Sequence, residues 1–560
     1  MNILPAQLRK SAANLRIAAA IAVLATIAAA NAAHAQANDP LLKAMQDELD
    51  REKIQLVLPG MHGPYFIEYR MDDISTYEAV ANYGALTREE ESHQRLVRVS
   101  VRVGGYQTDS SSSRGDGVVQ LGPRDNDPDA LRYALWIATD DAYKNALRAY
   151  SAKQAALERF QTQRGENDFS EEKPAVHIAA LAKLDLDRAE WKKRVVEASG
   201  LYATDPEVKA FADQVQYSVA NLRAVAMNRY LVNTEGTVVR QGYSAYSNTI
   251  SVGGQASDGM RLGRDNGSVA VTAKELDSWP AFRKRVIDDL KSLDALRRAP
   301  VVDATDYHGP VLFSGDAASD VLNRFFVPNV EAGRPDLGTT ARTTGAYNAS
   351  YKARVLPGFF NVVDDPLQTT FNGRGLIGAY AVDDEGVPAH PVPVVTNGTL
   401  ENYLIDRDPI KDFPNSNGHG RAAAGAPAHS QSGVMIFKPT NPVPADELNK
   451  RLLAMAKEQG HDVYAVETMG GDAPRLLYRV HASDGSRELV RGAVFDELDV
   501  RSLRSEIVAA GDDPYISQSM GVVPQTTIAP SLLFDEIGVK RANEEQQKLP
   551  YYPPPTLEGR

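Results

Sequence analysis

The side chains that could perform metal or nucleophilic chemistry are few and scattered along the chain. The 560 residues include ten histidines and no cysteine. A thiolate nucleophile and a thiolate metal ligand are therefore excluded. No two histidines have the i, i+4 spacing that places two metal ligands on one face of a helix. The histidine pattern does not predict a helical zinc site.

Two short motifs of other chemistries occur in unsuitable surroundings. Ser170-Glu171-Glu172-Lys173 has the Ser-x-x-Lys spacing of a nucleophile and its base, but its charged, polar neighbours would not lower the pKa of the lysine. Residues 373–378 spell Gly-x-Gly-x-x-Gly, and a dinucleotide site would need a helix directly after this motif. Strand and turn residues follow instead, so we expect neither site. His419 and His429 flank a loop of Ala and Gly, where we expect them to make hydrogen bonds at the surface.

The element that would position a catalytic group is a strand-to-helix elbow at residues 307–326. The apolar run Val311 to Phe313 predicts a short buried strand, and Gly315 then turns the chain into a helix that begins near Asp316. This helix offers Asp320, Asn323 and Arg324 and contains no histidine.

The N-terminal residues 1–35 are predicted to be an export signal. A basic start precedes the apolar run Ile17 to Ala30, and Ala33-His34-Ala35 is a small-x-small cleavage site before Gln36. The alternative of a membrane anchor is disfavoured because the run is shorter than a membrane span. The formal net charge of −12 becomes −15 once Arg9, Lys10 and Arg16 are removed. So acidic a body excludes a phosphate-driven interaction with nucleic acid.

Residues 36–300 are predicted to form a first, mixed α/β domain. Apolar and polar residues alternate from Val97 to Val103, which is the period of a half-buried strand. Asp127-Pro128 begins a long helix, and a second helix is predicted from Asp187 to Ser199, ended by Gly200. Further strands are expected at 214–226, 229–233 and 237–241, the last two joined by a turn at 234–236, and another helix at 278–298.

Residues 301–545 are predicted to form a second, mainly antiparallel β domain, followed by a Pro-rich tail at 546–560. Tight turns at Asp384-Glu385-Gly386 and Thr396-Asn397-Gly398 separate short apolar runs. The predicted fold class is therefore α+β with two domains.

Several of these segments together resemble the TldD/PmbA family, also called modulators of DNA gyrase. The resemblance rests on the elbow, on the order of turn, strand, Asn-Gly turn and Tyr403-Leu404-Ile405-Asp406-Arg407, and on the closing blocks 488–492 and 498–503. It implies a two-domain fold and a dimer. In catalytic members the elbow helix carries His-Glu-x-x-x-His and a cysteine further on completes the metal site. Both are missing here, so the resemblance gives this chain no catalytic and no metal-binding residue.

The function that the resemblance implies is that of a non-metal subunit in a peptidase-related assembly. The chain would pair with itself or with a TldD-like paralogue that carries the zinc, and would help to form a cleft for an unfolded or extended peptide. Candidate cleft residues lie in two Gly-rich loops: Gly373, Arg374, Gly375, Asn417, His419 and Arg421. The expected location is the periplasm or the cell exterior, without a stable membrane anchor after signal cleavage. The alternatives are an active metallopeptidase with an unrecognised site and a non-enzymatic periplasmic binding or scaffold protein.

Overall fold

The computed structural model describes residues 39–111, 115, 117–160, 165–303, 307–336, 338–471, 473–543 and 547–550. The predicted export signal and most of the predicted tail lie outside these residues. The two-domain α+β fold predicted from the sequence is confirmed, with one long sheet in the first domain and two sheets in the second. The boundary placed at residue 300 falls between helix α5 (Trp279–Arg298) and strand β9 (Tyr307–Phe313).

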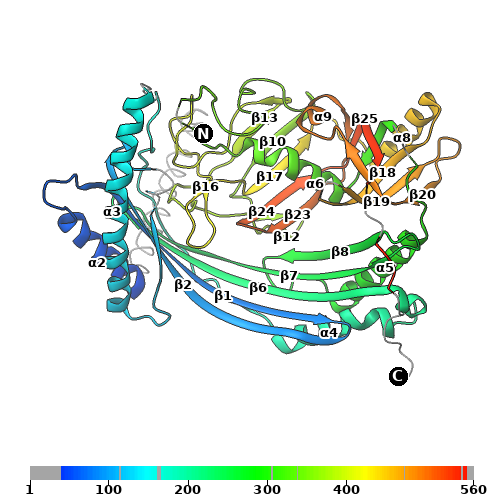
Figure 1. The fold of residues 1–560 in the computed structure, drawn as a ribbon, viewed down its shortest axis with the longest axis horizontal. Coiled ribbons are helices and arrows are strands. Elements are labelled where there is room, and N and C mark those ends of the chain that lie inside the picture. The colour runs from blue at the N-terminus through cyan, green and yellow to red at the C-terminus, as the bar shows by residue number, and fades with distance from the viewer. Residues whose placement is uncertain are drawn as a thin grey trace, which may run out of the picture.

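The first domain is built on a sheet of unusually long strands, which curve beneath the second domain (Figure 1). The order is β3-β2-β1-β6-β7-β5, with β4 paired to β2 and β8 paired to β7. The strands are β1 (Pro64–Asn82), β2 (Ala85–Gly105), β3 (Thr108–Asp109), β4 (Val118–Leu121), β5 (Val176–Ile178), β6 (Val215–Asn233), β7 (Val238–Gln255) and β8 (Arg261–Ala270). The four longest pair antiparallel: the hairpins β1–β2 and β6–β7 lie side by side and are joined through β1 and β6, which are far apart in the chain.

Helices cover one face of this sheet. The remaining helical elements are α2 (Pro40–Gln55), α3 (Pro128–Phe160), α4 (Arg188–Thr204) and the 3₁₀ turn η1 (Lys209–Gln214). Helices α2 and α3 stand at one end of the strands, and α4 and α5 lie at the other (Figure 1). As predicted, Val97 to Val103 alternate, with the valines fully buried against α2 and α3. Asp127 caps α3, since its carboxylate accepts from the N–H groups of Asp129 and Ala130.

Two details of the first domain differ from the sequence prediction. Segments 214–226 and 229–233 form the single strand β6, because Met227 and Asn228 continue the ladders with both neighbours. Helix α4 runs four residues past Gly200, which does not end it. Gly200 is buried against Gly84, and a Cβ at Gly200 would lie 3.0 Å from the Gly84 Cα. Its glycine is required by this close backbone approach.

The second domain contains two sheets around a shared core. One has the order β14-β13-β10-β17-β24-β23, and the other β20-β19-β18-β9-β25-β21, with β22 also on β25. Their strands are β10 (Phe360–Asp364), β13 (Val392–Thr396), β14 (Thr399–Leu400), β17 (Val434–Pro439), β18 (Val463–Gly470), β19 (Ala473–Val480), β20 (Arg487–Val490), β21 (Ala493–Asp496), β22 (Ile507–Ala510), β23 (Tyr515–Met520), β24 (Pro524–Ala529) and β25 (Leu532–Arg541). Two small hairpins are β11 (Thr370–Phe371) with β12 (Arg374–Gly375), and β15 (Gly420–Arg421) with β16 (His429–Ser430). The helices are α6 (Asp316–Phe325), α7 (Val327–Val330), α8 (Ala445–Gln459) and α9 (Val500–Ser505).

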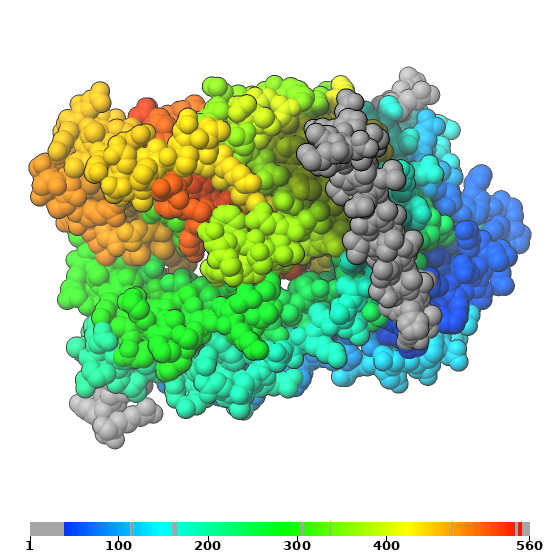
Figure 2. Space-filling model, turned by 180° about the vertical axis from the view of Figure 1, so that it is seen from behind, coloured from blue at the N-terminus to red at the C-terminus, as the bar shows by residue number. Residues whose placement is uncertain are grey.

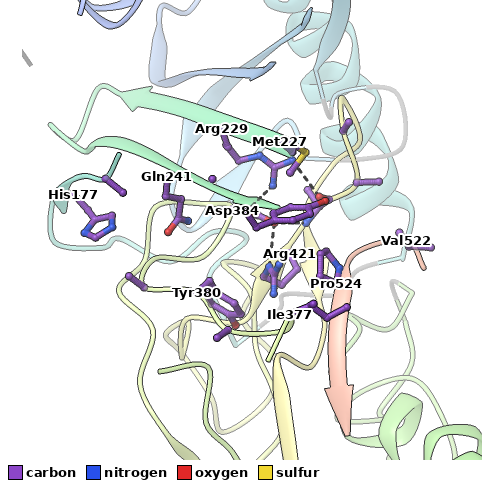
Figure 3. A pocket seen from close by; sticks show the side chains of 18 residues that line it. His177, Met227, Arg229, Gln241, Ile377, Tyr380, Asp384, Arg421, Val522 and Pro524 are labelled. Atoms are coloured by element: carbon purple, nitrogen blue, oxygen red, sulfur yellow. Dashed lines mark hydrogen bonds and ion pairs between the residues drawn. The ribbon is translucent and has the colours of Figure 1, made fainter. Parts of the chain in front are cut away.

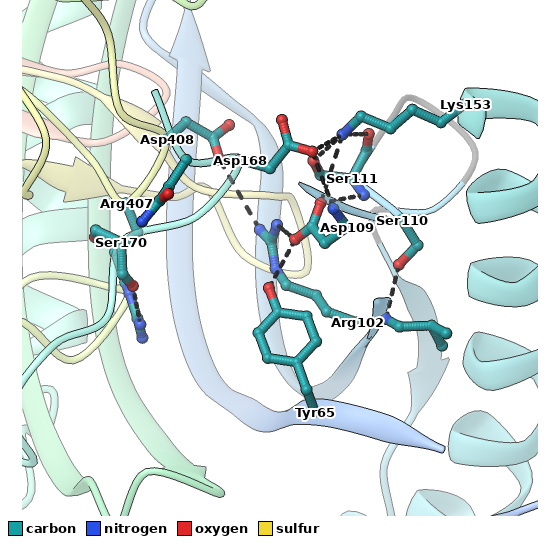
Figure 4. Close-up of polar contacts among 12 residues, drawn as sticks. Tyr65, Arg102, Asp109, Ser110, Ser111, Lys153, Asp168, Ser170, Arg407 and Asp408 are labelled. Carbon is teal, nitrogen blue, oxygen red and sulfur yellow. Dashed lines mark hydrogen bonds and ion pairs between the residues drawn. The ribbon is translucent and has the colours of Figure 1, made fainter. Parts of the chain in front are cut away.

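A connecting segment at residues 168–170 ties the two domains together beside α3 (Figure 4). The Asp168 carboxylate lies 2.5 Å from Lys153 Nζ and accepts the Asp109 N–H at 3.0 Å. The Ser170 carbonyl accepts from Arg407 Nη2 at 2.5 Å, and the same guanidinium makes two bonds to Glu235. Two parallel bonds from one guanidinium fix both distance and orientation. Arg407 of the second domain is thereby held to the turn between β6 and β7.

No helix among the described residues is long and apolar enough to cross a membrane.

Seen from behind, the yellow and orange segments of the second domain lie over the green and cyan segments of the first, and the boundary between them is hollowed (Figure 2).

Candidate functional site: two cavities joined by one hairpin

The elbow predicted from the sequence is present and forms the wall of a cavity. Strand β9 ends at Phe313, and Gly315, with φ of +52°, turns the chain into α6. This backbone region favours glycine. Helix α6 buries Ala317, Ala318 and Val321 in the core and turns its other face to solvent.

The solvent-facing side of α6 lines a cavity of about 440 Å³, called here the α6 cavity. Asp320 and Asn323 come from the helix, and Glu331 lies after α7. The opposite wall consists of the hairpin β23–β24, with Ser517, Gln518, Ser519, Gln525 and Thr527. Asn323 and Thr527 are joined by a hydrogen bond of 2.5 Å.

Acidic groups in this cavity hold their protons more tightly than usual. Burial, together with the nearby Asp316 carboxylate, raises the pKa of Asp320 to about 6. Burial raises the pKa of Glu331 to about 7, although the Ser432 N–H donates to it at 2.9 Å. Both carboxyl groups therefore change charge near neutral pH.

The residues of the α6 cavity do not form a metal centre. Throughout the described part of the chain, no group of three or more His, Asp or Glu side chains is arranged to hold a metal ion. Asp320 and Asn323 lie on the helix that carries the histidine ligands in the catalytic members of the family that this chain resembles. Of the described residues, the cavity offers the carboxyl groups of Asp320 and Glu331 and the amide of Asn323, without the histidine nitrogen or thiolate that catalytic zinc sites contain.

Strand β23 is the outer strand of its sheet, which matters for peptide recognition. Within the described residues it pairs only with β24, and its residues are exposed or partly exposed. An unpaired strand edge offers a row of backbone N–H and C=O groups to an extended chain. This edge borders the α6 cavity.

A second cavity, of about 220 Å³, lies where the second domain meets the inner face of the long sheet, and is called here the interdomain cavity (Figure 3). Asp384 lies between two guanidinium groups. Its carboxylate is 2.6 Å from Arg229 Nη1 and 3.2 Å from Arg421 Nε, and also accepts the Ala422 N–H at 2.8 Å. Burial alone would raise the pKa of Asp384, but the two arginines outweigh it and lower the pKa to about 2.

The first domain contributes two charged residues, Asp72 and Arg229, to its contact with the loop after β15. Asp72 of β1 and Arg229 of β6 are cross-strand partners, joined by a bond of 2.6 Å from Arg229 Nε. Asp72 also accepts the N–H of Gly425, in the loop after β15, at 2.8 Å. Arg229 donates to the Ala422 carbonyl at 3.2 Å. These buried bonds fix loop 422–425 on the sheet.

The six cleft residues proposed from sequence are not brought together. Arg421 lines the interdomain cavity, whereas Gly373, Arg374 and Gly375 form the β11–β12 hairpin. There the Gly375 N–H donates to Glu275 Oε2 at 3.0 Å. Asn417 holds its own loop, with side-chain bonds to Tyr403 and Ile405.

The prediction that His419 makes surface hydrogen bonds was wrong. His419 is fully buried, with Nδ1 2.9 Å from the Asn417 carbonyl and Nε2 3.3 Å from Asp364. His429 is exposed, as expected.

Buried carboxyl groups lie close to this loop. Asp383 accepts N–H bonds from Val387 and Gly420, and Glu385 accepts the Arg407 N–H. Burial, together with the neighbouring carboxyl groups, raises the pKa of Asp383, Glu385 and Asp406. The N–H donors oppose this effect at Asp383, because they favour its charged form.

The sequence analysis missed Arg229, Asp384 and Glu331 as site residues. One signal was available: Arg229 is a charged residue at the start of the apolar run predicted as the strand 229–233. Strand residues of this kind face a buried polar partner or a cavity. The partner, however, lies far away in the chain.

Residues 306–541 match the family model of the PmbA/TldA metallopeptidase C-terminal domain. A search of curated proteins finds no match. A protein described as a modulator of DNA gyrase from Thermotoga maritima is 14% identical, with a TM-score of 0.59 over 89% of this chain and 99% of that one.

Two further solved structures are similar to the same extent. TldE from Thermococcus kodakarensis is 13% identical with a TM-score of 0.58, over 89% of this chain and 99% of its own. A protein described as a modulator of DNA gyrase from Bacteroides thetaiotaomicron is 12% identical with a TM-score of 0.58, over 89% and 98%. At these identities the likeness shows the fold.

Proposed function

The chain belongs to the TldD/PmbA family, as its second domain shows, and from this premise we propose that it is the non-metal subunit of a peptidase-related assembly. It holds an extended peptide and leaves bond cleavage to a zinc-bearing paralogue. The protein acts in the periplasm or outside the cell.

The observation that carries this proposal is the α6 cavity beside the free edge of β23. A cavity of about 440 Å³ accommodates side chains of a bound peptide, while the strand edge pairs with the peptide backbone. Backbone pairing gives affinity without sequence preference, which suits unfolded substrates. The polar lining of the cavity, with Asn323, Gln518 and Thr527, is compatible with such a role.

The test is co-expression of the full-length protein with a paralogue from the same organism that carries His-Glu-x-x-x-His. We expect a stable complex with about one zinc per pair, and cleavage of an unstructured peptide that neither chain achieves alone. Ser519→Trp, which fills the cavity mouth, is expected to abolish cleavage but not assembly. The matched control Ser505→Trp, at the exposed end of α9, is expected to preserve both.

Two results would overturn the proposal. Zinc bound to this chain alone, with cleavage sensitive to a chelator, would identify an active metallopeptidase. Failure to associate with the paralogue, with peptide binding retained, would identify a binding or scaffold protein.

A further inference from the structure

The interdomain cavity contains a charged donor that no protein group satisfies. Arg421 is 6% exposed, and its Nη1 is buried with no hydrogen-bond partner among the described residues. The same guanidinium lies 4.0 Å from the centre of the Tyr380 ring and donates to Asp384 through Nε (Figure 3). A buried charged donor without an acceptor is costly, so the site is incomplete as it stands.

The balance of charge at the cavity wall points to the sign of the missing partner. Of the residues that the structure describes, Asp384 is the one carboxylate that lines the cavity, and it is shared between Arg229 and Arg421. On the side of the sheet, Arg229 also forms an ion pair with Asp72. In the described part of the chain Arg421 pairs with no second carboxylate, so an anion at Nη1 would supply the missing charge.

The remaining wall of the cavity has a polar part, formed by His177, Gln241 and Tyr243, and an apolar part. The apolar part is the one that would contact an uncharged side chain. The apolar part consists of small and aliphatic side chains, among them Met227, Ile377, Ala379, Ala381, Ala423 and Pro524. With about 220 Å³, the cavity is smaller than the usual pocket for a whole drug-sized ligand. It fits the end of a longer molecule, with one charged and one apolar group.

We propose that the interdomain cavity binds a ligand carboxylate, with Arg421 as the anchor and the apolar wall around the neighbouring side chain. A peptide with a free C-terminus combines these two groups in its last residue. Naming a peptide as the source rests on the proposed function, whereas carboxylate binding itself does not.

The position of the cavity supports a peptide terminus. Hairpin β23–β24 separates the two cavities: residues 517–519 face the α6 cavity, and Val522 and Pro524 line the interdomain cavity. A peptide paired with the edge of β23 therefore has the interdomain cavity at the hairpin end of the strand.

Calorimetric titration of the full-length protein with N-acetyl-L-phenylalanine tests the inference. We expect this acid to bind and its amide, which has the same shape without the charge, to bind at least about tenfold more weakly, the size of one charge-assisted hydrogen bond. A carboxylate could also come from an acidic side chain instead of a free C-terminus. N-acetyl-L-aspartic acid amide distinguishes the two sources, because its only carboxylate is in the side chain. Stronger binding of this compound would reassign the cavity to acidic side chains.

Variants separate ligand binding from folding. Arg421→Gln is expected to weaken the acid at least about tenfold and to leave the amide unchanged. Arg421→Lys keeps the positive charge but lacks the planar set of guanidinium donors. We expect its affinity for the acid to lie between that of the wild type and that of Arg421→Gln. Arg491→Gln is the matched control, since Arg491 is also buried and paired with an aspartate, Asp258, outside the cavity.

The inference is overturned if the acid and the amide bind equally, if the acid does not bind, or if both Arg421 variants, folded by near-UV circular dichroism, bind it as the wild type does. None of these measurements involves the paralogue. Failure of the assembly experiment and failure of carboxylate binding are therefore distinguishable.

Discussion

Asp384→Asn is expected to destabilise the contact between the two domains strongly. Asp384 is 6% exposed and pairs with Arg229 at 2.6 Å and Arg421 at 3.2 Å. The asparagine keeps the shape but removes the charge and leaves both guanidinium groups without this partner. Removing one partner of a buried ion pair costs about 3–5 kcal/mol.

The pKa of Asp384 gives an independent lower estimate. A fall from the ordinary 3.8 to about 2 corresponds to about 2 kcal/mol of folded-state stabilisation. Because the folded-state pKa is depressed, this contribution is present above the unfolded-state pKa. It is lost as the pH falls from about 4 through 2. The difference between wild type and variant should shrink in the same range.

The assay is urea unfolding of the full-length protein, followed by tryptophan fluorescence at several pH values. Asp412→Asn is the control, because Asp412 is half exposed and its pair with Arg342, at 2.7 Å, contributes at most about 1 kcal/mol. The reasoning is refuted if Asp384→Asn costs no more than Asp412→Asn at pH 7, or if the cost does not depend on pH below 5.

Three further predictions address other parts of the chain. Gly200→Ala should destabilise the protein by about 1–3 kcal/mol in the same urea assay, because the added Cβ meets the Gly84 backbone. This cost is expected although alanine has the better helix propensity. Gly165→Ala is the control and should be neutral, because open space surrounds Gly165. Asp406→Asn should flatten the pH dependence of stability. Burial raises the folded-state pKa of Asp406, so the contribution of this group to stability is full below pH about 4 and falls as the pH rises toward the raised pKa. An unchanged slope of melting temperature against pH between 4 and 8 would contradict this. Mass spectrometry of the protein exported by its own host should show Gln36 as the first residue, and an intact N-terminus would rule out signal cleavage.

Local sequence signals predicted the elements that they could determine. The alternation from Val97 to Val103, the Asp127 cap and the elbow at Gly315 each depend on residues close in the chain, and the structure confirms all three. A short-range pattern of this kind reports periodicity and turn geometry directly.

The sites depended on contacts that no local pattern contains. Asp384 and Arg229 are brought together from different domains, and Glu331 reaches the α6 cavity from the end of the short helix α7. His419 was placed at the surface because Gly and Ala surround it, but its loop is covered by β10 through Asp364. Gly200 carried the signal of a helix end, and the close approach of Gly84 overrode that signal.

Helix α6 keeps the residues that hold it in place apart from those that face the cavity. Ala317, Ala318, Val321 and Leu322 pack into the core, whereas Asp320 and Asn323 lie on the other side of the same helix. Substitutions on the cavity side therefore leave the buried side intact, so the chemistry of the cavity can change while the fold persists. The same separation makes α6 a suitable place to engineer a histidine pair into this chain.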